Sequence, residues 1–213
     1  ALERWLTLRL DAGEDVTSDV ERMLGEGNSA AIVSVLVNVA KHSPSLLTGT
    51  LAPLLTFPDL IYWDTARVKQ VSNNFVSWSR SHSGQEVFDI ARDWTLAPHR
   101  QKRFLDVVVE LMRSDDDVAR KLQSALPSWT LPKNPKEALE FKVLFAVLDK
   151  RNYQSVTDPK SGLEILEFVY PNALRLEVES WQAAKAPGLN WLLLPGQCEE
   201  RLQGGRPLGE HEA

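Results

Sequence analysis

Apolar residues recur at helical spacing along most of the first 150 residues, and this periodicity limits the fold more than any other feature. Val16, Val20 and Leu24 lie four residues apart, which places their side chains on one face of an α-helix. Comparable stripes run through residues 47–55, 61–78, 87–94, 104–112, 118–126 and 138–148. We therefore predict a mainly α-helical chain.

Segment 29–41 is apolar on nearly all sides. Its large apolar residues are Ile32, Val33, Val35, Leu36, Val37 and Val39. A helix that is hydrophobic on most faces is usually buried, and the segment is longer than a typical strand. We predict an inner helix, in which a charge at Val35 would unfold the chain.

Glycines and prolines divide the helical stripes. Pro44 ends the apolar helix, and one shorter helix is expected to carry the leucines at 47, 51, 54 and 55. Pro98 opens a helix that continues to Met112. No fixed repeat length connects these segments, so we predict irregular stacked helical hairpins, as in a HEAT- or TPR-like solenoid or an α–α superhelix.

Two segments carry clear helix-start signals. Asp115-Asp116-Asp117 places acids where they favour a helix N-terminus. Asn134-Pro135-Lys136-Glu137 combines a capping residue, a proline at the first helical position and a glutamate at the third. Both predict a helix that begins at these residues.

The pattern changes at Asn152. Tyr153–Thr157 and Leu163–Tyr170 suit two strands, and Asp158-Pro159 with Gly162 suits the turn between them. We predict a β-hairpin near 152–170, although 163–170 also fits a helix, and Pro171 should start a last helix. The expected domains are a helical-repeat segment at 1–150, the hairpin with a closing helix packed on it at 151–203, and a flexible tail at 204–213.

Composition excludes several classes of protein. A formal net charge of −5 gives the chain no general attraction for nucleic acid. Its single cysteine, Cys198, rules out an internal disulfide framework and fits a reducing, cytoplasmic compartment. No apolar run approaches the roughly 20 residues of a membrane span. The chain begins inside an amphipathic pattern at Ala1 without a methionine, so we expect a fragment of a longer protein.

The motifs that signal catalysis or cofactor binding are missing or out of context. Gly25–Ala30 matches G-x-G-x-x-A, but a charged, helix-spaced segment precedes it rather than a buried strand, so we predict a turn. There is no P-loop, and the four histidines lack metal-ligand spacing. We therefore predict no catalytic, metal or cofactor site.

His99-Arg100-Gln101-Lys102-Arg103 is the compact basic cluster of the chain. In the first turn of a helix its cations would oppose the macrodipole, which makes Arg100, Lys102 and Arg103 candidates for an interaction surface. The alternative is an ordinary solvated face. Seven tryptophans, most of them on helical stripes, suggest packing first and partner contact second.

Three stretches are similar to a known group of proteins. Residues 40–47 with 51–55 and 58–64, residues 91–100, and residues 145–153 with the hairpin and Leu194-Pro195 resemble the C-terminal helical region of large bacterial STAND- or NACHT-like ATP-binding proteins. The resemblance implies a segment that senses a trigger, often in antiphage defence, while the nucleotide-binding motifs lie elsewhere in the parent protein.

These observations favour a non-enzymatic sensing or scaffolding segment of a bacterial NTPase. Its partners would be other domains of the parent protein and a protein trigger. One alternative is a nucleic-acid-binding helical repeat that uses the basic cluster. The other is an enzyme with a non-sequential active site, which would show a deep pocket with convergent polar groups.

Overall fold

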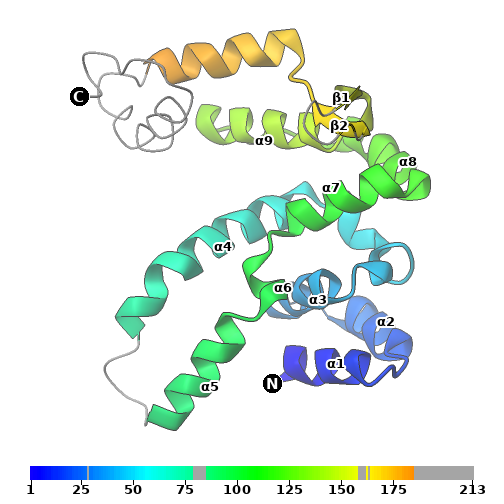
Figure 1. Ribbon diagram of the computed structural model, residues 1–213, viewed down its shortest axis with the longest axis vertical. Coiled ribbons are helices and arrows are strands. Elements are labelled where there is room, and N and C mark those ends of the chain that lie inside the picture. Colours follow the sequence, from blue (N-terminus) through cyan, green and yellow to red (C-terminus); the bar gives the residue numbers. More distant parts are fainter. Residues whose placement is uncertain (28, 79–84, 158–161, 163, 185–213) are drawn as a thin grey trace. The chain divides into compact units, whose positions relative to one another are not determined.

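The computed structural model describes residues 1–27, 29–78, 85–157, 162 and 164–184. It confirms a mainly α-helical chain with a small antiparallel hairpin (Figure 1). The chain divides into two compact units, Ala1–Val169 and Tyr170–Ala213. The predicted tail at 204–213 lies outside the described residues.

The first unit contains all the labelled elements. In chain order its helices are α1 (Leu2–Asp11), α2 (Thr17–Glu26), α3 (Ala30–His42), α4 (Pro58–Trp78), α5 (Gln85–Thr95), α6 (Pro98–Gln101), α7 (Phe104–Ser114), α8 (Asp116–Ala125) and α9 (Pro135–Val147). Short 3-10 helices lie between them: η1 (Pro44–Leu47), η2 (Ala52–Thr56), η3 (Leu126–Ser128) and η4 (Lys150–Asn152).

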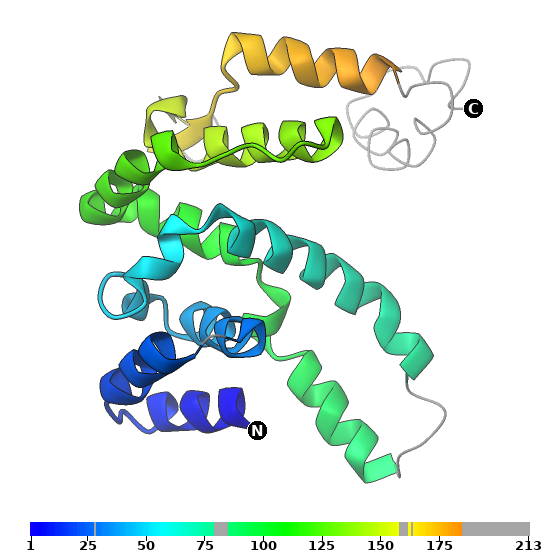
Figure 2. The same cartoon turned by 180° about the vertical axis from the view of Figure 1, so that it is seen from behind.

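The helices of this unit stack in an irregular order. α1 packs on α3, α3 on α6 and α7, and α4 on both α7 and α9 (Figures 1 and 2). Several of these neighbours are far apart in the sequence, whereas a regular array packs each repeat on the next. One apolar core runs between the helices, and its largest fully buried side chains include Leu6, Leu36, Leu55, Ile61, Phe104 and Met112.

The apolar helix α3 is an inner helix only in its second half. Residues Leu36–Lys41 are buried, whereas Ala31 and Ser34 are exposed and Val35 is half-buried. The expectation of an inner helix over 29–41 is therefore correct for the second half of the segment and wrong for its first two turns. Leu36 and Val39, both fully buried, mark the inner face better than Val35.

The predicted helix starts and turns agree with the structure. Asp115 caps α8 by accepting hydrogen bonds from the amides of Asp117 and Val118. Asn134 caps α9 in the same way. The Gly25–Ala30 motif includes the last two residues of α2 and the first residue of α3, with Ser29 capping α3, and residue 28 lies outside the described residues. No strand precedes that motif in the described residues, so it lacks the setting of a dinucleotide loop.

The single helix predicted after Pro44 is wrong. The chain forms η1 and η2 instead, separated by residues 48–51. Pro53 lies near the start of η2, and its lack of an amide hydrogen prevents a bond to the preceding turn. The leucines at 47, 51, 54 and 55 are nevertheless all buried, as their spacing suggested.

The continuous helix predicted from Pro98 to Met112 is also wrong. Helix α6 ends at Gln101, and Lys102 and Arg103 are extended before α7 begins at Phe104. In a continuous helix the Phe104 amide would bond to the carbonyl of residue 100. Here it donates to Asp64 Oδ2 of α4 at 2.7 Å. A carboxylate 40 residues away therefore provides the first turn of α7 with an acceptor.

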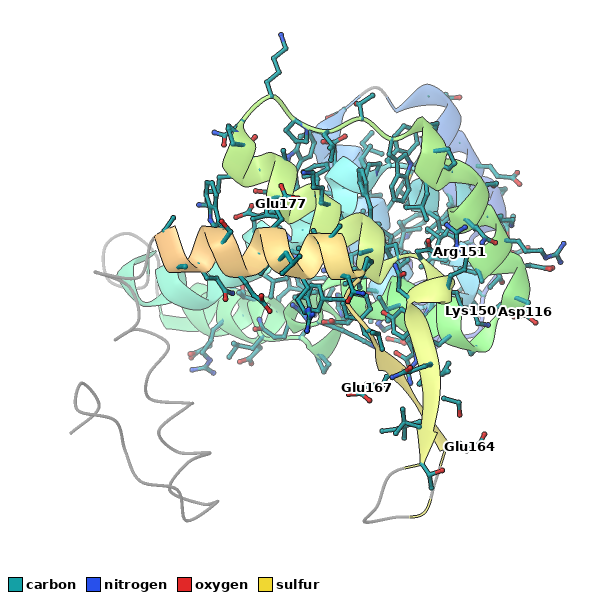
Figure 3. All side chains as sticks on the ribbon, turned by 90° about the horizontal axis from the view of Figure 1, so that it is seen from above. Asp116, Lys150, Arg151, Glu164, Glu167 and Glu177 are labelled. Carbon is teal, nitrogen blue, oxygen red and sulfur yellow. The ribbon has the colours of Figure 1, made fainter. Side chains whose placement is uncertain are left out.

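The predicted β-hairpin is confirmed. Strand β1 (Tyr153–Thr157) pairs antiparallel with β2 (Glu164–Phe168), with Tyr153 opposite Phe168. Gly162 has φ +70°, a conformation that glycine adopts without strain. Just before β1, Lys150 of η4 forms an ion pair of 2.8 Å with Asp116 of α8 (Figure 3). This contact ties the start of the hairpin to the helices.

The second unit contains one described helix. It spans residues 172–184 and follows Pro171, whose carbonyl accepts the amide of Arg175. Pro171 therefore precedes a helix as predicted. Cys198 and Trp191 lie outside the described residues.

Candidate functional site: a groove above a buried polar network

A groove of about 730 Å³ opens between α1, the end of α3, α5 and α6. We call it the α1–α5 groove. It is lined by Arg4, Thr7, Leu8 and Asp11 of α1, Lys41 and His42 of α3, Ile90, Asp93 and Trp94 of α5, and residues 97–99 and Lys102 around α6.

The groove is lined by exposed apolar side chains and by charged ones. Leu8 and Ile90 expose 58% and 52% of their surface, although both are aliphatic. Of the groove's charged residues, Arg4 and Asp93 are exposed and Lys102 is partly exposed. A surface that combines exposed apolar side chains with charges of both signs is typical of a protein-binding site.

Two histidines form the floor of the groove. His42 Nε2 lies 2.8 Å from Asp11 Oδ1. The rings of His42 and His99 meet edge to face, with centroids 5.1 Å apart, and Trp94 makes a similar contact with His99. The Asp11 carboxylate holds one nitrogen of His42, and the rings of His42 and Trp94 pack against the ring of His99. These contacts fix the orientation of both imidazoles.

Beneath the groove, the buried carboxylate of Glu3 connects α1 to α3 and α6. Its Oε1 lies 3.1 Å from His99 Nε2 and its Oε2 accepts a hydrogen bond of 3.1 Å from Asn38 Nδ2. Arg100 Nε forms an ion pair of 3.4 Å with Oε1 without hydrogen-bond geometry. Burial acts to raise the pKa of Glu3, but the His99 hydrogen bond and the Arg100 charge outweigh it and lower the pKa.

A second buried carboxylate, Asp64, joins α4 to α3 and α7. Its Oδ1 accepts from Lys41 Nζ at 2.9 Å and from Arg67 Nη2 at 2.8 Å. Its Oδ2 accepts the Phe104 amide. Arg67 also donates to Asn38, which joins the Asp64 cluster to Glu3. The two carboxylates face the guanidinium groups of Arg67 and Arg100 and the ammonium of Lys41. The network links α1, α3, α4, α6 and α7.

The ammonium group of Lys41 has no exposure to solvent. Burial lowers the pKa of Lys41 to about 8, although the Asp64 carboxylate acts in the opposite direction. The unfolded chain therefore binds more protons than the folded chain between about pH 8 and the ordinary lysine pKa of about 10.4. Within this window, Lys41 makes the free energy of unfolding increase as pH rises.

We predict that this increase is measurable as a difference between the wild type and Lys41→Met. Urea unfolding at steps from pH 7.5 to 9.5 should show the wild type gaining stability relative to the variant, by at most about 3 kcal/mol over the full window. The comparison cancels the titration of groups shared by the two proteins. A difference that stays constant or decreases with pH would refute a lowered pKa of Lys41 in the folded chain.

The three candidate surface residues lie in different surroundings. Arg100 is about three-quarters buried against Glu3, and its guanidinium lies 5.8 Å from the centre of the Trp94 ring. Lys102 lines the groove and pairs with Glu110. Arg103 points to Asp106, with which it forms two hydrogen bonds. The break after α6 separates Arg100 from Arg103, so they do not form the single helical face expected from their spacing.

Substitution of the two arginines should therefore have unequal effects. Arg100→Ala leaves the Glu3 carboxylate without its neighbouring guanidinium, and we expect a loss of about 1–2 kcal/mol. Arg103→Ala removes an exposed pair and should change stability by less than about 0.5 kcal/mol. Equal losses in chemical denaturation would show that the two environments are alike.

Sequence reasoning missed most of the groove floor and its network. His42 and Asp11 are 31 residues apart, and His99 and Glu3 are 96 apart. No motif connects such positions. A weak signal was present, since Asn38 and Lys41 are polar residues within the most apolar helix of the chain.

Within the described residues, no cluster of three or more histidine, cysteine or acidic side chains is arranged to hold a metal ion. None of the described helices has the length and apolarity to cross a membrane. No protein-family model, curated protein or solved structure matches the chain.

Proposed function

We propose that this chain is a non-catalytic recognition segment that binds a protein partner in the α1–α5 groove. The observation that carries the proposal is the pair of exposed aliphatic side chains, Leu8 and Ile90, in a groove whose floor is fixed by the buried network. Rigid support lowers the entropic cost of ordering the surface when a partner binds.

The charges of the groove favour a protein over a nucleic acid. The exposed or partly exposed charges of the lining are Asp11 and Asp93 together with Arg4 and Lys102. Acidic side chains repel a phosphate backbone, whereas a protein segment presents charges of both signs. An amphipathic helix suits this composition, because its apolar stripe can pack on Leu8 and Ile90 while its polar flanks contact the charged side chains of the groove.

The wider setting is a larger bacterial NTPase that senses a trigger. The resemblance of residues 40–64, 91–100 and 145–153 to the C-terminal region of STAND- or NACHT-like proteins supports this part of the proposal. The coding sequence of the full-length protein tests it, because a P-loop motif must then lie outside the chain described here.

Groove variants of the full-length protein test the recognition function. Leu8→Asp and Ile90→Asp replace the two exposed aliphatic side chains of the groove with charges and leave the core unaltered, since both side chains are exposed. Each should abolish trigger-dependent activity, read as ATP hydrolysis or as protection of cells against phage. Leu131→Asp, at an exposed leucine outside the groove, is the matched control. Normal activity of both groove variants would refute the proposal.

The nucleic-acid alternative predicts a different result. Each residue of the basic cluster faces an acid: Arg100 faces Glu3, Lys102 faces Glu110 and Arg103 faces Asp106. We expect no binding of labelled duplex DNA or RNA in anisotropy titrations at 20 mM salt. Binding that falls steeply with salt and weakens in Lys102→Ala/Arg103→Ala would favour the nucleic-acid function instead.

One observation favours hydrolytic chemistry as a second candidate. His42 lines the open groove and is held by Asp11, and a carboxylate-held imidazole is a common general base. The hydroxyl of Thr7 in the same lining is buried and donates to the Arg4 carbonyl, so water would have to be the nucleophile. Turnover of p-nitrophenyl acetate that His42→Gln abolishes would support this function. The recognition function predicts that His42→Gln hydrolyses the ester no more slowly than the wild type.

A further inference from the structure

A second recess lies between α3 and α4, apart from the groove. Its volume is about 290 Å³, and its apolar walls include Val33, Val37, Leu60 and Trp63. Ser34, Asp64 and Arg67 supply its polar groups. Trp63 is 59% exposed, which leaves most of its indole ring available to a ligand.

The Asp64 carboxylate at the recess faces two cations, which is one more positive charge than it carries negative charge. The single carboxylate of Asp64 faces both Lys41, at 2.9 Å, and Arg67, at 2.8 Å. Arg67 uses Nε and Nη2 in its hydrogen bonds to Asp64 and Asn38. Among the described residues, no group accepts a hydrogen bond from Nη1. Arg67 lines the recess and its side chain is 26% exposed, so part of the guanidinium remains available to a ligand.

We propose that this recess binds a small apolar group that carries one carboxylate. The apolar walls and Trp63 would hold a ring or a short aliphatic chain, and Arg67 Nη1 would donate to the carboxylate. Charge-assisted hydrogen bonds of this kind are the stronger ones. One negative charge balances the excess, whereas a doubly charged phosphate would exceed it beside Asp64.

The volume limits the size of the ligand. Sites for drug-sized molecules usually occupy about 300–1,000 Å³, so the recess suits one aromatic ring and not a nucleotide. The same chemistry occurs in a free monocarboxylate and in the C-terminus of a peptide that ends in phenylalanine. The proposal is independent of the groove, because it depends on other walls and another ligand.

Isothermal titration with two acids and their amides tests the proposal. The probes are 3-phenylpropionate and a tetrapeptide that ends in phenylalanine, each compared with the corresponding amide. At least one acid should bind at least tenfold more tightly than its amide. Tighter binding of 3-phenylpropionate would indicate a metabolite-like ligand. Tighter binding of the peptide acid would indicate a protein C-terminus. Equal binding of acid and amide, or no binding of either acid, would overturn the proposal.

Variants locate the binding to the recess. Arg67→Gln should remove the preference for acid over amide, whereas Arg120→Gln, at an exposed arginine of α8, should retain it. Because Arg67 also contacts the buried network, Ser34→Trp provides a second test. Ser34 is exposed on α3, so a larger side chain can enter the recess without disturbing the core. Unchanged acid affinity in a folded Ser34→Trp protein would contradict the assignment.

Discussion

Asp64→Ala should lower the free energy of unfolding by about 3–5 kcal/mol, the loss typical of removing one partner from a buried ion pair. The substitution leaves the Lys41 ammonium buried without its carboxylate. It also removes the acceptor of the Phe104 amide, which begins α7. Urea unfolding followed by circular dichroism provides the measurement.

Asp93→Ala is the matched control for this prediction. It removes the same charge from a side chain that is 70% exposed, and its effect should stay within about 0.5 kcal/mol. Asp64→Asn keeps an oxygen that can accept the Phe104 amide but removes the charge. Its loss of unfolding free energy should lie between those of Asp64→Ala and Asp93→Ala. If Asp64→Ala is no more destabilising than Asp93→Ala, the buried network does not hold these helices together.

Phe104→Ala should cost about 3–5 kcal/mol, the usual range for deleting a fully buried aromatic ring. Phe104 is completely buried in the core at the start of α7. Phe57→Ala makes the same chemical change at a ring that is 54% exposed, and should cost less than about 1 kcal/mol. Similar losses for the two variants would mean that Phe104 is not packed in the apolar core.

Local signals predicted the parts of the fold that depend on neighbours in sequence. Asn134 and Asp115 cap their helices through amides two and three residues ahead, which the capping pattern describes directly. The hairpin follows from two strand-like runs around Gly162. Apolar spacing also identified buried positions correctly where the backbone differed, as in the leucines of η1 and η2.

The errors occurred where a distant residue decides the local structure. The chain from Pro98 to Met112 has helical spacing throughout, yet it breaks at Lys102 and Arg103. Asp64, 40 residues earlier, binds the Phe104 amide at that break. Likewise, the site depends on pairs such as Glu3 with His99 that no local pattern connects. Arg100 is an example. The basic cluster suggested an exposed charge at this position, whereas in the structure Arg100 pairs with the buried Glu3 and is itself mostly buried.

Crosslinking from inside the groove can identify what binds there. A photoreactive p-benzoylphenylalanine replaces Ile90 in the full-length protein, and a second variant carries it at Leu131 as the exposed control. After illumination in cells exposed to the trigger, our account predicts a protease-sensitive protein adduct at position 90 and none at 131. Adducts at both positions alike, a nuclease-sensitive adduct, or no adduct at position 90 would contradict protein recognition by the α1–α5 groove.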